Sequence, residues 1–121
     1  MNYKQYILVL KKYRDVSKGK FGAHCAHASL AASLKEGVTS ERFTIWYEGN
    51  DQTKILKAVK NLSKLNGMIK KALELGVSAS IIPDNGASGE VPKGTVLMGA
   101  IGPITEEEAK QLGILKLSNL N

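Results

Sequence analysis

A short, almost unbroken apolar run near the N-terminus most constrains how this chain can fold. Residues 6–10 read Tyr-Ile-Leu-Val-Leu and contain no charged side chain. Such a run is typical of a strand that is buried on both faces, as central strands of α/β proteins are. We therefore expect residues 6–10 to form a central strand of a covered sheet.

The rest of the chain alternates between helical and strand-like patterns. We expect further strands at residues 53–60, 77–82 and 95–101, and helices at 20–36, 40–48, 63–75 and 105–113. The last helix begins with a capping-box pattern at Thr105 and Glu108, and residues 114–117 either add a strand or pack as a tail. This order predicts a single three-layer α/β/α domain over residues 1–121, with a small four-stranded mixed sheet whose strand order stays open.

The composition indicates the compartment in which such a domain works and the kind of ligand that its charge attracts. The only cysteine is Cys25, which excludes an internal disulfide and fits a reducing compartment. We find no secretory signal and no apolar stretch approaching the ~20 residues that span a bilayer, so we expect a cytoplasmic protein that does not bind membranes. The net charge of +6 comes almost entirely from lysine. It indicates either an ordinary solvated surface or attraction to the phosphates of a polyanion.

Residues 18–28 combine charge and acid–base chemistry at the start of the first expected helix. Helical spacing places Lys20, His24 and His27 on one stripe. A helix N-terminus flanked by lysines favours an anion, and its field favours a neutral imidazole that accepts a proton. A metal site or a Cys25 nucleophile is less favoured, because Cys25 lies on another face of the helix and few other ligands are present.

Two further positions have both a structural and a functional interpretation. Lys57 is the charged member of an otherwise apolar strand face, so it either protects an edge strand or points into a cleft toward an anion. Asp84 and Ser88 belong to a loop that follows a strand, either as an ordinary turn or as part of a site. The site requires this loop to meet the first helix, where Asp84 could orient His27 or a water molecule.

Taken together, these motifs resemble the class 2 peptidyl-tRNA hydrolases found mainly in archaea and eukaryotes. The family's pattern G-K-G-K-x-A-A-Q-C-x-H-A is matched by residues 18–28, and its D-A-G-x-T segment by residues 84–88, with serine in place of threonine. Its P-x-G-T segment and following Gly-Pro occur at residues 92–95 and 102–103, and its L-K-L at 115–117. Lys57 falls where the family has a lysine. In two departures, His24 replaces a glutamine and Gly22 an alanine.

The resemblance implies hydrolysis of the ester between a peptide and the 3′ ribose of tRNA, without a metal or another cofactor. It implies His27, Asp84 and Lys20 as catalytic residues, with either His27 or Asp84 activating water. Substrate binding would then involve Lys18, Lys57, Ser88 and His24. It also makes a homodimer reasonable. The alternative is a catalytically silent domain of the same fold that binds RNA or a partner protein, which the His24 departure favours.

Overall fold

The computed structural model describes residues 1–120 and contains one four-stranded mixed sheet of strand order β2-β1-β4-β3. The central strand β1 (Tyr3–Leu10) runs parallel to β2 (Lys54–Val59) and antiparallel to β4 (Val96–Thr105). On the other side of β4, β3 (Ala79–Pro83) pairs with it in the antiparallel sense. The predicted α/β class, mixed sheet and buried central strand are therefore confirmed.

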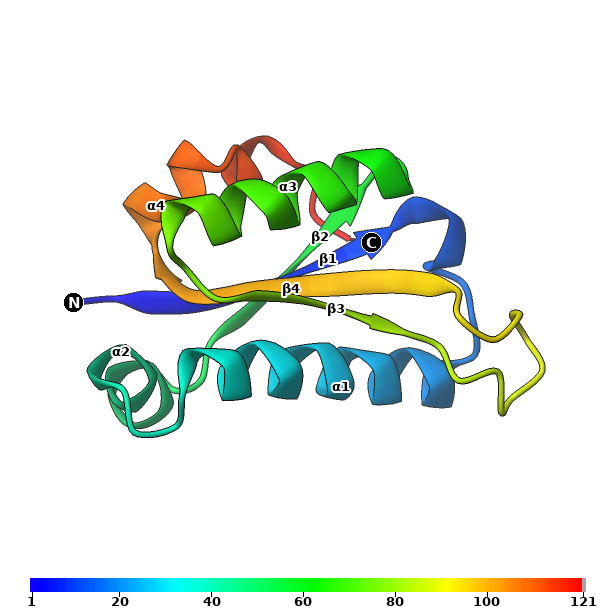
Figure 1. Cartoon of the computed structure of the whole chain (residues 1–121), viewed down its shortest axis with the longest axis horizontal. Helices are drawn as coiled ribbons and strands as arrows, with labels where there is room; N and C mark the ends of the chain where they lie inside the picture. The colour runs from blue at the N-terminus through cyan, green and yellow to red at the C-terminus, as the bar shows by residue number, and fades with distance from the viewer. Residues whose placement is uncertain (121) are drawn as a thin grey trace.

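Helices cover both faces of the sheet (Figure 1). The long helix α1 (Lys18–Glu36) and the short α2 (Glu41–Thr44) lie on one face. On the other face lie α3 (Leu62–Leu75) and α4 (Glu106–Gln111). Small residues allow α1 to pack closely, since Ala28 and Ala32 are fully buried in a cluster with Ile7 and Val9 of β1.

The second face is covered by an amphipathic helix whose pattern is clear in the sequence. Leu65, Met68, Ile69 and Ala72 of α3 are buried at helical spacing, which confirms Met68 as a core residue. The predicted cap at Ser63 is wrong, because the side chain of Asn61 accepts the hydrogen bond from the Lys64 N–H and starts the helix two residues earlier. The helix ends, as expected, at Gly76 in the left-handed conformation.

Other boundaries differ where tertiary packing overrides local pattern. The strand expected to end at residue 101 continues through Gly102 and Pro103 to Thr105, because Ile104 and Thr105 pair with Lys4 and Tyr3 at the start of β1. The predicted capping box between Thr105 and Glu108 is present. Residues 114–116 form a 3₁₀ turn (η3, Ile114–Lys116) that buries Ile114 in the core, so of the two alternatives for this segment packing without a strand is the correct one.

One edge of the sheet collects the loops that follow β1, β2 and β3. The parallel pairing of β1 with β2, and the antiparallel pairing of β4 with both β1 and β3, place Leu10, Val59, Pro83 and the first residue of β4 at this edge. Helix α1 also begins here, so its first turns meet the β3–β4 loop (Figure 1). Within residues 1–120, no helix combines the length and apolar character that a bilayer span requires.

Candidate active site

A polar pocket of about 260 Å³ lies between the first turns of α1 and the loop that joins β3 to β4. From α1 and its cap come Ser17, Lys20, Ala23, His24 and His27; from the loop come Asp84, Asn85, Ala87 and Ser88. The predicted stripe of Lys20, His24 and His27 therefore does face one pocket. The two segments that the sequence left unconnected meet here: His24 and Asp84, 60 residues apart in the chain, share a hydrogen bond.

The carboxylate of Asp84 is the centre of the hydrogen-bond network. Its Oδ2 accepts from Lys20 Nζ at 2.6 Å and from His24 Nε2 at 2.7 Å, while Oδ1 accepts from the Gly86 N–H at 2.6 Å. The bonds from Lys20, His24 and Gly86 hold the pKa of Asp84 far below its usual range. Asp84 is therefore a firmly ionised anchor with three donors, and a carboxylate in this state is a weak base.

The backbone around Asp84 is fixed by its own strand pair. The Asp84 N–H donates to the Thr95 carbonyl and the Gly94 N–H donates to the Asp84 carbonyl, both at 2.7 Å. Gly86 adopts a φ of +78°, and a Cβ there would lie 3.0 Å from Lys93. Only glycine fits this turn without strain, and the turn is what aims the Gly86 N–H at Asp84.

A second contact fastens the β3–β4 loop to the start of α1. Glu90 accepts hydrogen bonds from both the N–H and the hydroxyl of Ser17, the N-cap residue of α1. These two bonds lower the pKa of the Glu90 carboxyl. We call this pair of hydrogen bonds the Ser17–Glu90 latch. Sequence reasoning missed it, because one glutamate in a loop rich in Gly and Ser gives no sign of the residue that it contacts.

Lys20 and Ser88 contact each other directly inside the pocket. Lys20 Nζ donates to Ser88 Oγ at 2.7 Å in addition to its bond with Asp84. An ammonium group carries three hydrogens, so one remains for a further acceptor. Because Ser88 Oγ accepts from Lys20, its own hydroxyl hydrogen is also available to a bound molecule.

The two histidines have different surroundings. His24 is buried, with its Nε2 donating to Asp84 and its Nδ1 without a hydrogen-bond partner among the described residues. His27 is exposed, lines the same pocket, and its ring centroid lies 6.0 Å from that of His24. Of the two expectations for Asp84, the orientation of His27 is wrong, since the imidazole bonded to Asp84 is that of His24; the orientation of a water molecule stays a prediction.

Two of the expected binding lysines do not line this pocket. Lys18 is exposed at the first residue of α1, beside the pocket in sequence but outside its lining. Lys57 lies on the face of β2 opposite α1, where its Nζ donates to the carbonyl of Leu117 at 3.3 Å. The interpretation of Lys57 as a cleft residue is thus wrong for this pocket, whereas β2 is indeed an edge strand.

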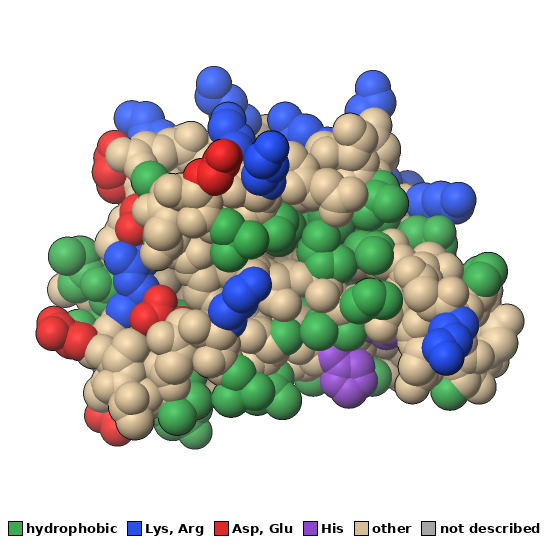
Figure 2. All heavy atoms as spheres, in the orientation of Figure 1, with side chains coloured by type: hydrophobic (Ala, Val, Ile, Leu, Met, Phe, Trp, Pro, Cys, Tyr) green, Lys and Arg blue, Asp and Glu red, His purple; other side chains and the backbone are tan. Residues whose placement is uncertain are grey.

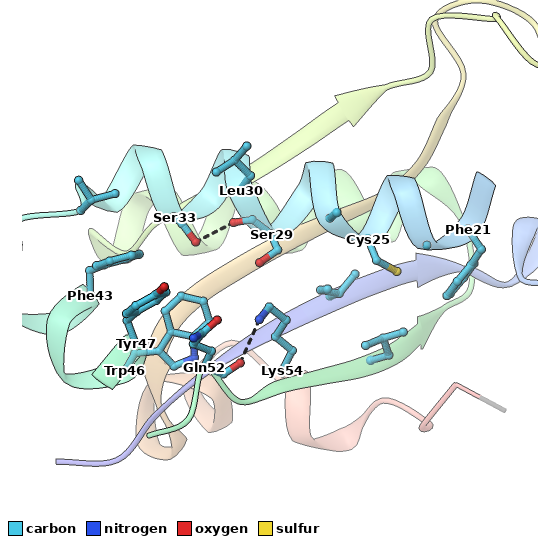
Figure 3. A pocket seen from close by; sticks show the side chains of 15 residues that line it. Phe21, Cys25, Ser29, Leu30, Ser33, Phe43, Trp46, Tyr47, Gln52 and Lys54 are labelled. Atoms are coloured by element: carbon cyan, nitrogen blue, oxygen red, sulfur yellow. Dashed lines mark hydrogen bonds between the residues drawn. The ribbon is translucent and has the colours of Figure 1, made fainter. Parts of the chain in front are cut away.

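Cys25 belongs to a separate, apolar groove of about 540 Å³ between α1, the strands β1 and β2, and the segment around Phe43–Tyr47 (Figure 3). Burial raises the pKa of its thiol, which makes it a poor nucleophile. The aromatic side chains of Phe43, Trp46 and Tyr47 line the other end of the groove. Within residues 1–120, no three side chains of the metal-binding types gather at one place.

Comparison with known proteins finds one family over nearly the whole chain. A model of the family described as "Peptidyl-tRNA hydrolase PTH2" matches residues 3–118. A protein of Nanoarchaeum equitans named peptidyl-tRNA hydrolase is 41% identical over 113 residues, which cover 92% of this chain and 96% of that one. Proteins of the same name from Thermococcus onnurineus and Sulfolobus acidocaldarius are 35% and 37% identical, and cover 95% and 85% of this chain and 97% and 90% of their own.

Proposed function

The chain belongs to the PTH2 family of peptidyl-tRNA hydrolases, and on that basis we propose how the pocket around Asp84 carries out the reaction. The reaction is hydrolysis of the ester that joins a peptide to the ribose of tRNA. Water adds to the ester carbonyl, the carbonyl oxygen becomes negatively charged, and the ribose oxygen leaves. The site must therefore take a proton from water, stabilise the oxyanion and return the proton to the ribose oxygen.

His27 is the proposed general base. Its imidazole lines the pocket and is exposed, with no hydrogen bond to another described residue that would occupy it. Asp84 suits this role less, since three donors and a lowered pKa make its carboxylate a weak base. In this scheme His27 accepts the proton of the attacking water and then gives it to the leaving ribose oxygen.

Lys20 is the proposed oxyanion donor. Asp84 and Ser88 each accept one of its hydrogens, which fixes the ammonium group and leaves the third hydrogen for the substrate. A donor that is already oriented needs no rearrangement as negative charge develops on the carbonyl oxygen. Asp84 then serves as the anchor of Lys20 and His24, Ser88 positions the substrate, and Lys18 attracts tRNA phosphates from the rim of the pocket.

The single observation that carries this assignment is the convergence of Lys20 and His24 on one oxygen of Asp84. It is tested by hydrolysis of an N-blocked aminoacyl-tRNA by wild type, His27→Ala and Asp84→Ala. We expect His27→Ala to lower kcat by a factor on the order of 10² to 10⁴, as loss of a general base does. We expect Asp84→Ala to lower it as well, because Lys20 loses its anchor. Unchanged turnover in the double variant would reject the assignment.

The alternative of a catalytically silent RNA-binding or protein-binding domain is not favoured, since the relatives are named as hydrolases. The departure at His24 does not remove the network either, because an imidazole N–H donates to Asp84 here. Salt-sensitive tRNA binding without turnover would favour that alternative.

We further propose that the whole chain acts as one domain, in the cytoplasm, as a homodimer. A single sheet that joins all four strands supports the first point, and a substrate of translation supports the second. The apolar groove on α1 supports the third: Leu30, Leu34, Val38 and Tyr47 around it are each about half exposed or more. Contiguous exposed apolar surface of this kind marks interfaces between proteins.

A further inference from the structure

Charged side chains are unevenly distributed along the long axis of the molecule. Acidic residues gather where α1 ends, around α2 and at the start of α4, as in Glu36, Glu41 and the run 106–108. In the view of Figure 2 the acidic side chains lie toward that end, while the other end, where the histidines lie, shows lysine or arginine side chains and no acidic ones. The edge of the sheet that holds the catalytic pocket is thus the positive end.

The acidic groups at this positive end already have partners. Asp84 accepts from Lys20 and His24, Glu90 accepts from Ser17, and Asp15 pairs with Arg14 at 3.8 Å. The lysines around them are exposed and form no ion pair within residues 1–120: Lys11, Lys12, Lys60, Lys64 and Lys93. Within that range none of these ammonium groups has a carboxylate partner, and that of Lys12 lies 5.5 Å from the centre of the Tyr13 ring.

Two of these lysines share a second pocket, of about 430 Å³. Lys12 comes from the turn after β1 and Lys60 from the residue after β2, and parallel pairing brings these two strand ends together. Tyr13, Leu62, Gly94 and Thr95 also line this pocket. Two lysines line one hollow without an acidic partner, and their positive charge favours an anionic ligand.

The second pocket lies close to the catalytic one, because hydrogen-bonded backbone joins their linings. The backbone of Asp84 exchanges hydrogen bonds with Gly94 and Thr95, which line the second pocket. The two pockets therefore lie at one edge of the sheet, separated by the β3–β4 strand pair. A tRNA strand whose 3′ end lies at Asp84 can pass over this edge of the sheet to reach Lys12 and Lys60.

We propose that the pocket formed by Lys12 and Lys60 binds a backbone phosphate of the tRNA while the ester lies in the catalytic pocket. This inference rests on the proposed function, because the substrate supplies the phosphates. Lysine binds a phosphate as a point charge and does not read bases, so this contact holds tRNAs of any sequence. It would act on substrate binding and not on the chemical step.

The test compares wild type with a double variant that carries both Lys12→Gln and Lys60→Gln. We expect KM for peptidyl-tRNA at 50 mM salt to rise about tenfold and kcat to stay the same, as expected for two lost surface charge contacts. Each phosphate contact weakens about threefold between 50 and 200 mM salt, so kcat/KM of the variant should fall about threefold less over this range than that of wild type. Lys12→Arg with Lys60→Arg should restore both values.

Matched controls separate this site from a general effect of charge. Lys70→Gln with Lys110→Gln removes the same charge from exposed positions outside the pocket and should leave KM unchanged. An N-acetylaminoacyl ester of adenosine, which has the ester and no phosphate, should be hydrolysed equally by wild type and by the Lys12/Lys60 variant. Equal loss in both double variants, or no change in the Lys12/Lys60 variant, would overturn the proposal.

A measurement of Kd for deacylated tRNA keeps the two proposals distinguishable. If wild type hydrolyses neither ester but its tRNA binding is weakened by the Lys12/Lys60 change alone, the proposed function fails and the phosphate site stands. If wild type hydrolyses both esters and neither KM nor Kd responds to that change, the phosphate site fails and the proposed function stands.

Discussion

Asp84 gathers three hydrogen-bond donors from two parts of the chain, and this limits what it can do. A carboxylate in such surroundings stays ionised well into acid and holds its neighbours in place. The exposed His27 is left as the group that can exchange a proton with water. Division of labour between an ionised anchor and a free imidazole is how neighbouring titratable groups commonly take different roles.

Substitution of His24 tests whether the hydrogen bond to Asp84 must come from an imidazole. A glutamine, the residue of the family pattern, also offers an N–H toward Asp84, so we expect His24→Gln to keep kcat within about tenfold of wild type. His24→Leu cannot donate and should lower kcat by about 10²-fold, since small displacements of catalytic groups have effects of that size. Steady-state kinetics on peptidyl-tRNA provide the measurement. Equal activity of the leucine and glutamine variants would show that the bond has no role in catalysis.

The lowered pKa of Asp84 also predicts how stability depends on pH. The unfolded chain binds a proton at Asp84 near pH 3.9, whereas the folded chain binds it only at lower pH. The stability that this group contributes is therefore complete above about pH 4 and is lost as pH falls through the folded-state pKa. Urea unfolding between pH 7 and pH 2.5 should show a shallower loss below pH 4 for Asp84→Asn than for wild type. Parallel curves would contradict this prediction.

The β3–β4 loop is held by bonds at both ends and by the tight turn at Gly86. Alanine at residue 86 would combine a strained φ of +78° with a Cβ 3.0 Å from Lys93, so we expect Gly86→Ala to lower the free energy of unfolding by roughly 1–3 kcal/mol. Gly89 has a similar φ of +76°, but a Cβ added there would meet no atom within 4 Å, so Gly89→Ala isolates the backbone strain. Denaturant titration should find Gly86→Ala the less stable; the reverse order would refute the crowding argument.

Elements with strong local signals could be predicted from sequence, and elements set by partners could not. Residues 6–10, the α3 periodicity and the Thr105–Glu108 capping box each carry their own pattern, and all three are present. The segment 114–117, which is apolar except for Lys116, is too short for its pattern to separate a strand from a turn. The alternation of side chains along a strand predicts that Lys57 and Leu56 lie on opposite faces of the sheet. The sequence of β2 does not indicate which of these faces α1 covers.

The residues that line the site could be predicted from the sequence better than the hydrogen bonds between them. Lys20, His24 and His27 share one helix face by spacing alone, and that face does line a pocket with Asp84 and Ser88. Which histidine meets Asp84 depends on how far the loop reaches along α1. His24 and His27 differ by three residues, about 4.5 Å of helix rise, and the sequence does not fix the loop to that accuracy.

The molecule as a whole has two exposed surfaces of opposite character, a lysine-rich edge and the apolar groove on α1. If the groove joins two copies, light scattering should give twice the 13.1 kDa chain mass, and Leu34→Lys should shift it toward the monomer. Leu73→Lys alters an exposed leucine of α3 on the other sheet face and should leave the mass unchanged. A wild-type mass of one chain at high concentration would refute the proposed homodimer.

The latch between Ser17 and Glu90 has a consequence for how substrate is received. The loop is already bonded to the helix that bears Lys20 and the histidines. The free-energy cost of arranging the reactive groups is therefore incurred during folding, and substrate binding does not require the closure of a lid. Such an enzyme should turn over at a rate insensitive to solvent viscosity once substrate is saturating. Cutting the latch would transfer that cost to each catalytic cycle.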